Sequence, residues 1–131
     1  QDNGYTYIEP QAYLTCWVAL TDTDEENGCP WVMPGLHQRG TLFHDSTDLG
    51  HEIPLDASEA IPLPLKAGSI AIFSSLTPHR TGPNLSEGIR KSYILQYAPE
   101  GSKRVISQSS AEDLNDETGQ FLILKDGKEV N

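Results

Sequence analysis

Short runs of β-branched and aromatic residues alternate along the chain with clusters of Gly, Pro, Asn and Asp, which is typical of a mainly β protein. Residues 12–20, "AYLTCWVAL", form the first predicted strand, and their high apolar content on both faces indicates a strand inside a two-layer sandwich. Residues 31–33 predict a second, short strand. Residues 61–75 predict two strands around Ala67 and Gly68, and the prolines of the first place it at a sheet edge.

Residues 90–98, "RKSYILQYA", alternate in the manner of a strand, so that Arg90 shares one face with Ser92 and Ile94. Residues 36–60 show little periodicity and hold three of the four histidines, which predicts a long functional loop. The polar tail predicts a short helix near residues 110–117 and a hairpin at Asp126-Gly127. The natural class is a β-sandwich or jelly-roll barrel.

Composition narrows the choice of partners and compartment. The 131 residues suffice for one domain, and the net charge of −10 argues against a nucleic-acid partner. No stretch approaches the ~20 apolar residues of a membrane helix, so we expect no membrane partner. Cys16 and Cys29 lack a C-x-x-C neighbour and lie beside apolar runs, which predicts buried free thiols and a cytoplasmic location.

Three residues suggest a metal site. Mononuclear non-haem iron(II) is held by two histidines and one carboxylate on one face of an octahedron. Asp2 and His79 are candidate ligands, and Arg90, on the strand that returns after His79, offers the planar fork that suits a carboxylate. Spacing alone leaves open an ordinary hairpin with surface charge.

Two longer stretches carry a resemblance to a known family. Residues 15–37, "TCWVALTDTDEENGCPWVMPGLH", and residues 78–97, "PHRTGPNLSEGIRKSYILQY", resemble the phytanoyl-CoA dioxygenase family of iron(II)/2-oxoglutarate oxygenases. The shared features are W-x-A-L before an acidic loop, then N-G-C, then P-G-x-H, and later a histidine followed after eleven residues by an arginine. Several spaced elements agree, and together they cover residues 1–98.

The resemblance implies a double-stranded β-helix of the cupin-like jelly-roll kind, incomplete in this chain. Residues 1–131 would be the C-terminal portion of one oxygenase domain, with core strands in 1–98 and an extension in 99–131. It also implies Fe(II), the cosubstrate 2-oxoglutarate and O2, and hydroxylation of an unactivated C–H bond of a small molecule with release of succinate and CO2.

Site residues follow from the same resemblance. It makes Asp2 and His79 metal ligands, with the remaining histidine of the H-x-D motif immediately before Gln1 and so outside this sequence. Arg90 would anchor the far carboxylate of 2-oxoglutarate. The resemblance also implies cosubstrate contacts from Thr81 and Trp17 and places Tyr5 close to the metal. Ser92, on the same face as Arg90, is a further candidate for a cosubstrate contact, and the candidates for substrate contacts are Tyr5, Tyr7 and His37.

Three questions stay open at this point. A non-catalytic cupin-like binding module that has lost its iron is the alternative to an enzyme. Within the enzyme class, Asp2 favours hydroxylation, because related halogenases replace this carboxylate with a small residue to admit chloride. The loop at 36–60 carries one arginine against several acids, which favours a small or cationic substrate over a polyanionic CoA thioester.

Overall fold

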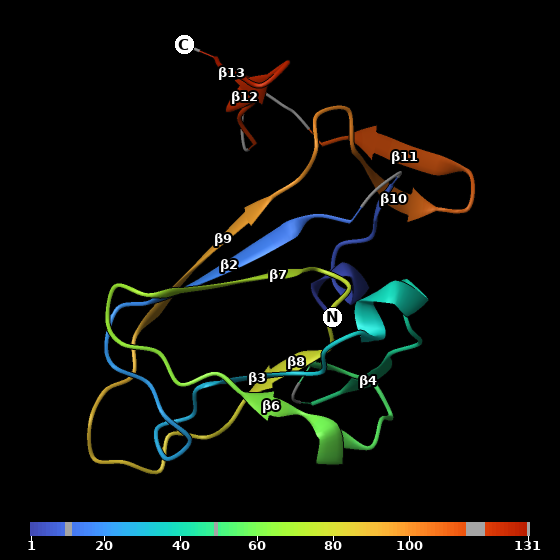
Figure 1. Cartoon of the computed structure of the whole chain (residues 1–131). Helices are drawn as coiled ribbons and strands as arrows, with labels where there is room; N and C mark the ends of the chain where they lie inside the picture. Colours follow the sequence, from blue (N-terminus) through green and yellow to red (C-terminus); the bar gives the residue numbers. More distant parts are fainter. Residues whose placement is uncertain (10–11, 49, 115–119, 131) are drawn as a thin grey trace.

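Two three-stranded antiparallel sheets face each other (Figure 1). The computed structural model describes residues 1–9, 12–48, 50–114 and 120–130. The larger sheet has the order β7-β2-β9, and the smaller has the order β6-β3-β8. Their strands are β2 (Leu14–Ala19), β7 (Ile70–Ser74), β9 (Ser92–Tyr97), β3 (Pro30–Val32), β6 (Ile61–Pro62) and β8 (His79–Thr81). This mainly β arrangement confirms the predicted jelly-roll class.

Strand β2 forms because its side chains alternate between two environments. Thr15, Trp17 and Ala19 are buried, whereas the intervening residues are more exposed. Trp17 and Ala19 form a core cluster with Ala71 of β7, and partly buried side chains pack against it from both sheets: Leu63, Leu65 and Phe73. The core therefore lies between the two sheets, on the inner face of β2.

Strand β9 pairs with β2 along its whole length, from Leu14 opposite Tyr97 to Ala19 opposite Ser92. Ile94 lies opposite Trp17 and therefore shares its inner face, as the alternation from Arg90 onward predicts. In the smaller sheet, Trp31 pairs with Pro62, which places β6 at the predicted edge. A proline is tolerated there because an edge strand leaves one row of N–H groups unpaired.

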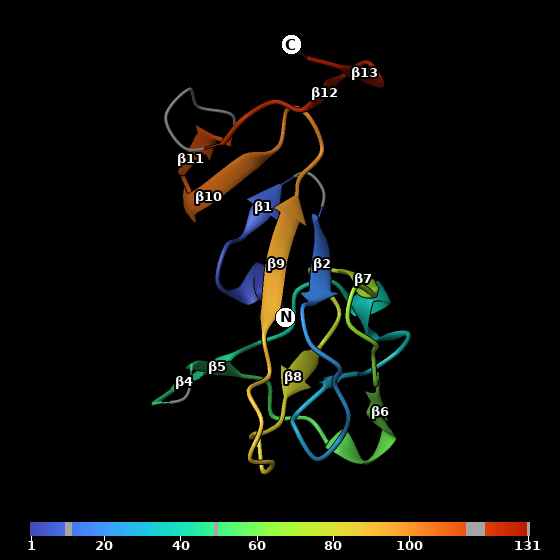
Figure 2. The same cartoon turned by 90° about the vertical axis from the view of Figure 1, so that its left-hand side faces the viewer.

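The connection between β3 and β6 contains more structure than the predicted loop. It forms two 3₁₀ helices, η2 (Leu36–Arg39) and η3 (Ala57–Glu59), and a hairpin of β4 (Asp45–Thr47) and β5 (Gly50–Glu52). The side chain of Asp56 caps η3 by accepting a hydrogen bond from the Ser58 amide at 2.9 Å. Figure 2 shows the β4–β5 hairpin extending to one side of the smaller sheet.

The helix expected near residues 110–117 is wrong for its described part. Residues Ser110–Asp113 form strand β11, which pairs with β10 (Lys103–Ser107), and β10 pairs in turn with β1 (Ile8–Glu9). Cross-strand ion pairs favour the sheet: Arg104 with Glu112 at 2.7 Å and Lys103 with Asp113 at 3.7 Å. Residues 115–117 lie outside the described residues.

The hairpin predicted at Asp126-Gly127 is confirmed. It joins β12 (Leu124–Lys125) to β13 (Lys128–Glu129), and both turn residues have positive φ, 50° for Asp126 and 74° for Gly127. Such a pair of positive φ angles is what the Asp-Gly dipeptide favours in a two-residue turn.

Both cysteines are free, as predicted. Cys29 is completely buried and Cys16 is half-buried. Burial raises the pKa of the Cys29 thiol. Within the described part of the chain, no helix has the length and apolar character needed to cross a membrane.

Candidate metal centre

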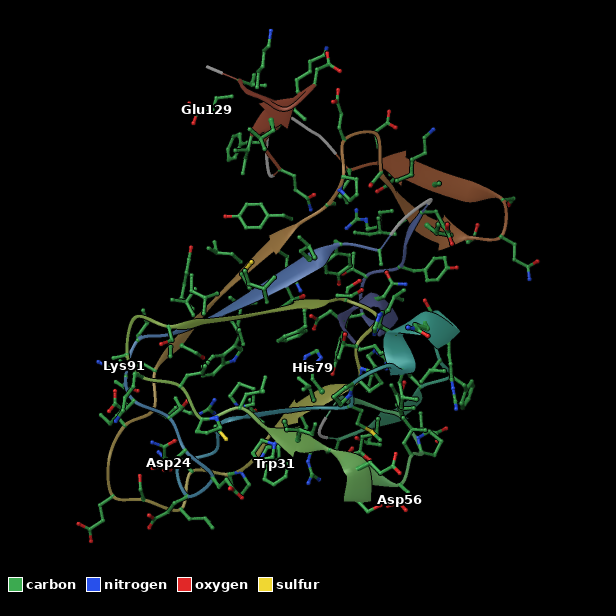
Figure 3. The ribbon with its side chains drawn as sticks, in the orientation of Figure 1. Asp24, Trp31, Asp56, His79, Lys91 and Glu129 are labelled. Atoms are coloured by element: carbon green, nitrogen blue, oxygen red, sulfur yellow. The ribbon has the colours of Figure 1, made fainter. Side chains whose placement is uncertain are left out.

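Asp2 and His79 lie side by side although they are far apart in the sequence. Asp2 begins the short 3₁₀ helix η1 (Asp2–Gly4), and His79 is the first residue of β8. The Asp2 Oδ1 and His79 Nε2 atoms are 3.4 Å apart, and the two side chains are 18% and 21% exposed, respectively. Figure 3 shows His79 on the side of β8 that faces the larger sheet. One metal ion can therefore contact both groups.

The imidazole of His79 is held in one orientation. Its Nδ1 atom lies 2.9 Å from the carbonyl oxygen of Thr77. Because a carbonyl only accepts, Nδ1 carries a hydrogen, and Nε2 is the ring atom that faces Asp2. The ring of Phe73, on β7, packs against the imidazole with a centroid distance of 4.7 Å. This arrangement suits a histidine that binds metal through Nε2.

The Asp2 carboxyl stays ionised in spite of its surroundings. Burial raises its pKa, but the interactions with His79 and the hydrogen bond from Thr15 outweigh burial, and the pKa lies below its ordinary value of 3.8. A carboxylate in this state accepts hydrogen bonds only and is ready to bind a cation.

The residues on either side of Asp2 fix the backbone at the site. Gln1 is 6% exposed and Asn3 is 2% exposed. The Gln1 amide donates to the carbonyl oxygens of Gly40 and Leu76 and accepts from the Leu42 amide at 2.9 Å, and Asn3 donates to the Thr41 hydroxyl. Sequence reasoning missed both side chains. The one feature of the sequence that could have indicated them is that a residue with an amide side chain stands on each side of Asp2.

Arg90 lies two residues before β9 and is half-buried. Its Nε atom is buried and has no hydrogen-bond partner among the described residues. A buried guanidinium N–H without an acceptor is costly, so this atom is a candidate to donate a hydrogen bond to a bound anion. Ser92, at the start of β9, is half-buried as well, whereas Thr81, at the end of β8, is exposed.

The remaining predicted contacts are dispersed. Trp17 is 5% exposed and belongs to the core. Tyr5 is 61% exposed, and its hydroxyl accepts a hydrogen bond from the His51 amide at 2.9 Å. The Tyr7 hydroxyl donates to Glu9 at 2.6 Å, and His37 is exposed on η2.

A cavity of about 330 Å³ borders His79. Loop 36–60 supplies much of its wall, including His51 and Glu52, and the smaller sheet supplies Trp31 and Arg80. The Arg80 guanidinium lies 5.8 Å from the centre of the Trp31 ring. Sequence reasoning found the loop but not these two sheet residues, because only the pairing of β3 with β8 brings them together.

A 2-His-1-carboxylate centre needs two histidines and one carboxylate, and the neighbouring pair of Asp2 and His79 offers one group of each kind. Over residues 1–9, 12–48, 50–114 and 120–130, no group of three or more His, Cys, Asp or Glu side chains is placed to hold a metal ion. The pair nevertheless fits part of an iron site of that type, because Asp2 Oδ1 and His79 Nε2 lie 3.4 Å apart, and the Arg90 Nε–H lacks an acceptor among the described residues.

Proteins with similar sequences are known. The sequence model of the phytanoyl-CoA dioxygenase (PhyH) family matches residues 1–92. The chain is 33% identical to phytanoyl-CoA dioxygenase 1 of Oryza sativa subsp. japonica, over 66% of this chain and 33% of the relative. It is 34% identical to methylphosphonate hydroxylase of Gimesia maris, over 72% of this chain and 35% of the relative.

Solved structures agree with the fold. The non-haem monooxygenase ThoJ aligns with 93% of this chain and 47% of its own length, at a TM-score of 0.73 and 30% identity. EvdO2 from Micromonospora carbonacea var. aurantiaca, solved with 2-oxoglutarate, aligns with 82% of this chain and 46% of its own length, at a TM-score of 0.68 and 28% identity. The chain thus spans less than half the length of these relatives, and it belongs to the phytanoyl-CoA dioxygenase family of non-haem iron, 2-oxoglutarate-dependent oxygenases.

Proposed function

We propose that this chain carries part of the active centre of an iron(II)- and 2-oxoglutarate-dependent dioxygenase that hydroxylates an unactivated C–H bond of a small molecule, with release of succinate and CO2. The observation that carries the proposal is the 3.4 Å approach of Asp2 Oδ1 to His79 Nε2. Two relatives support it: one is named a hydroxylase, and the other was solved with 2-oxoglutarate bound.

The chain's own residues would bind and orient the reactants. Asp2 and His79 hold the iron, which when bound supplies the activation of dioxygen. Arg90 pairs with the far carboxylate of 2-oxoglutarate, and its Nε–H, which otherwise lacks an acceptor, donates a hydrogen bond to that carboxylate. Ser92 and Thr81 are the two candidates for a hydroxyl contact to the same carboxylate. Ser92 lies on the same face of the strand as Arg90, is closer to Arg90 in sequence and is less exposed than Thr81.

The cavity beside His79 is the place that we assign to the substrate. Its volume of about 330 Å³ lies at the lower end of the range for small-molecule sites. Of the acids in loop 36–60, only Glu52 lines it, and Arg80 lines it as well. A preference for a cationic substrate therefore rests on Glu52. Glu52→Gln should reduce that preference, whereas replacing the outward acids should not.

Arg90 offers the first test. Arg90→Ala should weaken 2-oxoglutarate binding about 10- to 100-fold, because a hydrogen-bonded charge partner is worth about 1.5–3 kcal/mol. Isothermal titration with 2-oxoglutarate in the presence of Fe(II) under anaerobic conditions measures the change. Arg39→Ala, at an exposed position on η2, is the matched control and should bind as the native chain does. Equal affinity in both variants would refute the anchor.

The metal ligands offer the second test. Asp2→Ala and His79→Ala should each abolish the thermal stabilisation by Fe(II) and the formation of succinate from 2-oxoglutarate. Asp48→Asn, an exposed turn residue, should leave both unchanged. If the native protein gains no stability from Fe(II) and 2-oxoglutarate together, the alternative of a non-catalytic cupin-like module is the better description.

A further inference from the structure

The two carboxylate oxygens of Asp2 have different partners. Oδ1 faces His79 Nε2 at 3.4 Å, whereas Oδ2 accepts a hydrogen bond from the Thr15 hydroxyl at 2.5 Å. A carboxylate can only accept, so the Thr15 hydroxyl proton points to Oδ2. One oxygen is thereby engaged by the protein, and the other is left for a ligand.

Thr15 is placed to hold this contact firmly. It is 2% exposed and lies on the inner face of β2, with Phe73 of β7 and Gln96 of β9 directly opposite it in the sheet. Phe73 is also the ring that packs against His79. A single row of side chains across the larger sheet therefore contacts both members of the candidate metal centre.

The backbone of Asp2 is fixed independently of Thr15. Its carbonyl oxygen accepts hydrogen bonds from the amides of Tyr5 and Thr6, and the next residue, Asn3, donates its amide hydrogen to Ser75. What remains free is the rotation of the Asp2 side chain. Of the described groups, Thr15 and His79 are the two that contact the carboxylate, and Thr15 is the one that is not itself a candidate ligand.

We propose that Thr15 is a positioning residue that keeps Asp2 Oδ2 occupied and so restricts Asp2 to binding a divalent metal through Oδ1 alone. The inference rests on the proposed function. Its chemical consequence is a free coordination position: a carboxylate that turned to bind through both oxygens would occupy one more site on the metal. A 2-oxo acid and dioxygen together need three such sites, so one-oxygen binding by Asp2 keeps the centre open.

The test compares Thr15→Val, which keeps the shape and removes the hydroxyl, with Thr15→Ser, which keeps the hydroxyl. Co(II) alone is the probe, because its visible absorption reports coordination number and its binding can be titrated without turnover. Thr15→Val should weaken Co(II) binding about 10- to 100-fold, the usual effect of losing a hydrogen bond to a ligand. It should also shift the Co(II) spectrum, and Thr15→Ser should restore both.

Thr23→Val is the matched control, since Thr23 is 4% exposed and bonds to Leu65, away from the site. It should lower thermal stability without changing the Co(II) spectrum. If circular dichroism shows that Thr15→Val does not fold, Thr15→Ala replaces it, and the same weaker Co(II) binding and shifted spectrum are expected. If the hydroxyl-free variant binds Co(II) with the native affinity and the native spectrum, the role of Thr15 is overturned but the proposed function is not. A native protein whose Co(II) binding is absent, or unaffected by His79→Ala, would overturn the proposed function and this inference with it.

Discussion

At the scale of single residues, Gly28 shows how a loop is fitted against its neighbour. Its φ is +83°, and a Cβ placed on it would lie 2.4 Å from the carbonyl oxygen of Gly82. Gly28→Ala should therefore lower the free energy of unfolding by about 1–2 kcal/mol for the left-handed backbone and by about 1–3 kcal/mol more for overpacking. Urea unfolding, followed by the fluorescence of Trp17 and Trp31, measures the loss.

Gly68 provides the control for this prediction. Its φ is +86°, nearly the same, but no atom lies within 4 Å of the Cβ position. Gly68→Ala should show the backbone cost alone. Equal losses in the two variants would mean that the approach of Gly28 to Gly82 does not matter for stability.

At the residue scale, the sequence indicates candidates where a side chain has a chemical signature. Asp2, His79 and Arg90 have ligand or anion-binding chemistry and match a family pattern, and the structure brings the first two together. The sequence does not indicate the roles of Gln1, Asn3 and Thr15, because those roles depend on hydrogen bonds to segments far along the chain. No local pattern encodes such partners.

At the scale of elements, Asp22 links the loop after β2 to the turn before β7. Its carboxylate accepts hydrogen bonds from Lys66 Nζ at 2.8 Å and from the Ala67 amide at 2.9 Å. The Lys66 hydrogen bond, followed by that from Ala67, lowers the pKa of Asp22 below its ordinary value of 3.8. A carboxyl with a lowered pKa in the folded state adds stability above its unfolded value, and this is lost as pH falls through the folded pKa.

Asp22→Asn should therefore unfold at a slightly lower temperature than the native chain at neutral pH, and the difference should shrink as the pH falls below 3.8 and disappear once the pH is below the lowered pKa of folded Asp22. The effect is small because the pair is exposed, and 1 M salt should reduce it further. Thermal unfolding followed by circular dichroism across this pH range provides the measurement. A difference that persists unchanged into acid would show that Asp22 acts through packing rather than through its charge.

Strands were predictable from sequence where one face meets the core. The alternation in residues 12–20 reflects the burial of Trp17 and Ala19 in the core, and residues 90–98 continue it because Ile94 lies opposite Trp17 in the sheet. The error at residues 110–113 has the opposite origin: this stretch is exposed on both faces, so hydrophobic alternation gives no signal. Its pairing depends on the oppositely charged residues of β10, which sequence spacing does not reveal.

At the scale of the whole molecule, the larger sheet is apolar on its outer face as well as on its inner one. The exposed large side chains on this face come from all three strands: Leu14, Ile70, Ile72, Tyr93 and Tyr97. A contiguous apolar surface of this kind promotes association. The high apolar content of residues 12–20 predicts burial of both faces, whereas in β2 the inner face is buried and the outer face is half-buried or exposed.

Ile72, 62% exposed at the centre of β7, is the position at which to test this face. Ile72→Thr keeps a β-branched side chain and should change the free energy of unfolding by no more than about 0.5 kcal/mol. It should reduce self-association at high protein concentration, as measured by light scattering. Ile106→Thr, on the separate strand β10 and 54% exposed, is the control. A reduction in both variants alike would mean that total hydrophobicity, rather than this face, drives association.

The hydrogen bond from Gln1 to Leu76 closes a span of 75 positions, and the neighbouring contact of Asp2 with His79 closes a similar one. Long spans of this kind are joined late, because ordering the intervening chain must come first. The candidate centre is therefore a product of completed folding and has no local precursor. In a refolding experiment with Co(II), the visible absorption of bound Co(II) should appear no earlier than the last change in tryptophan fluorescence. Metal binding would then report the last step of folding.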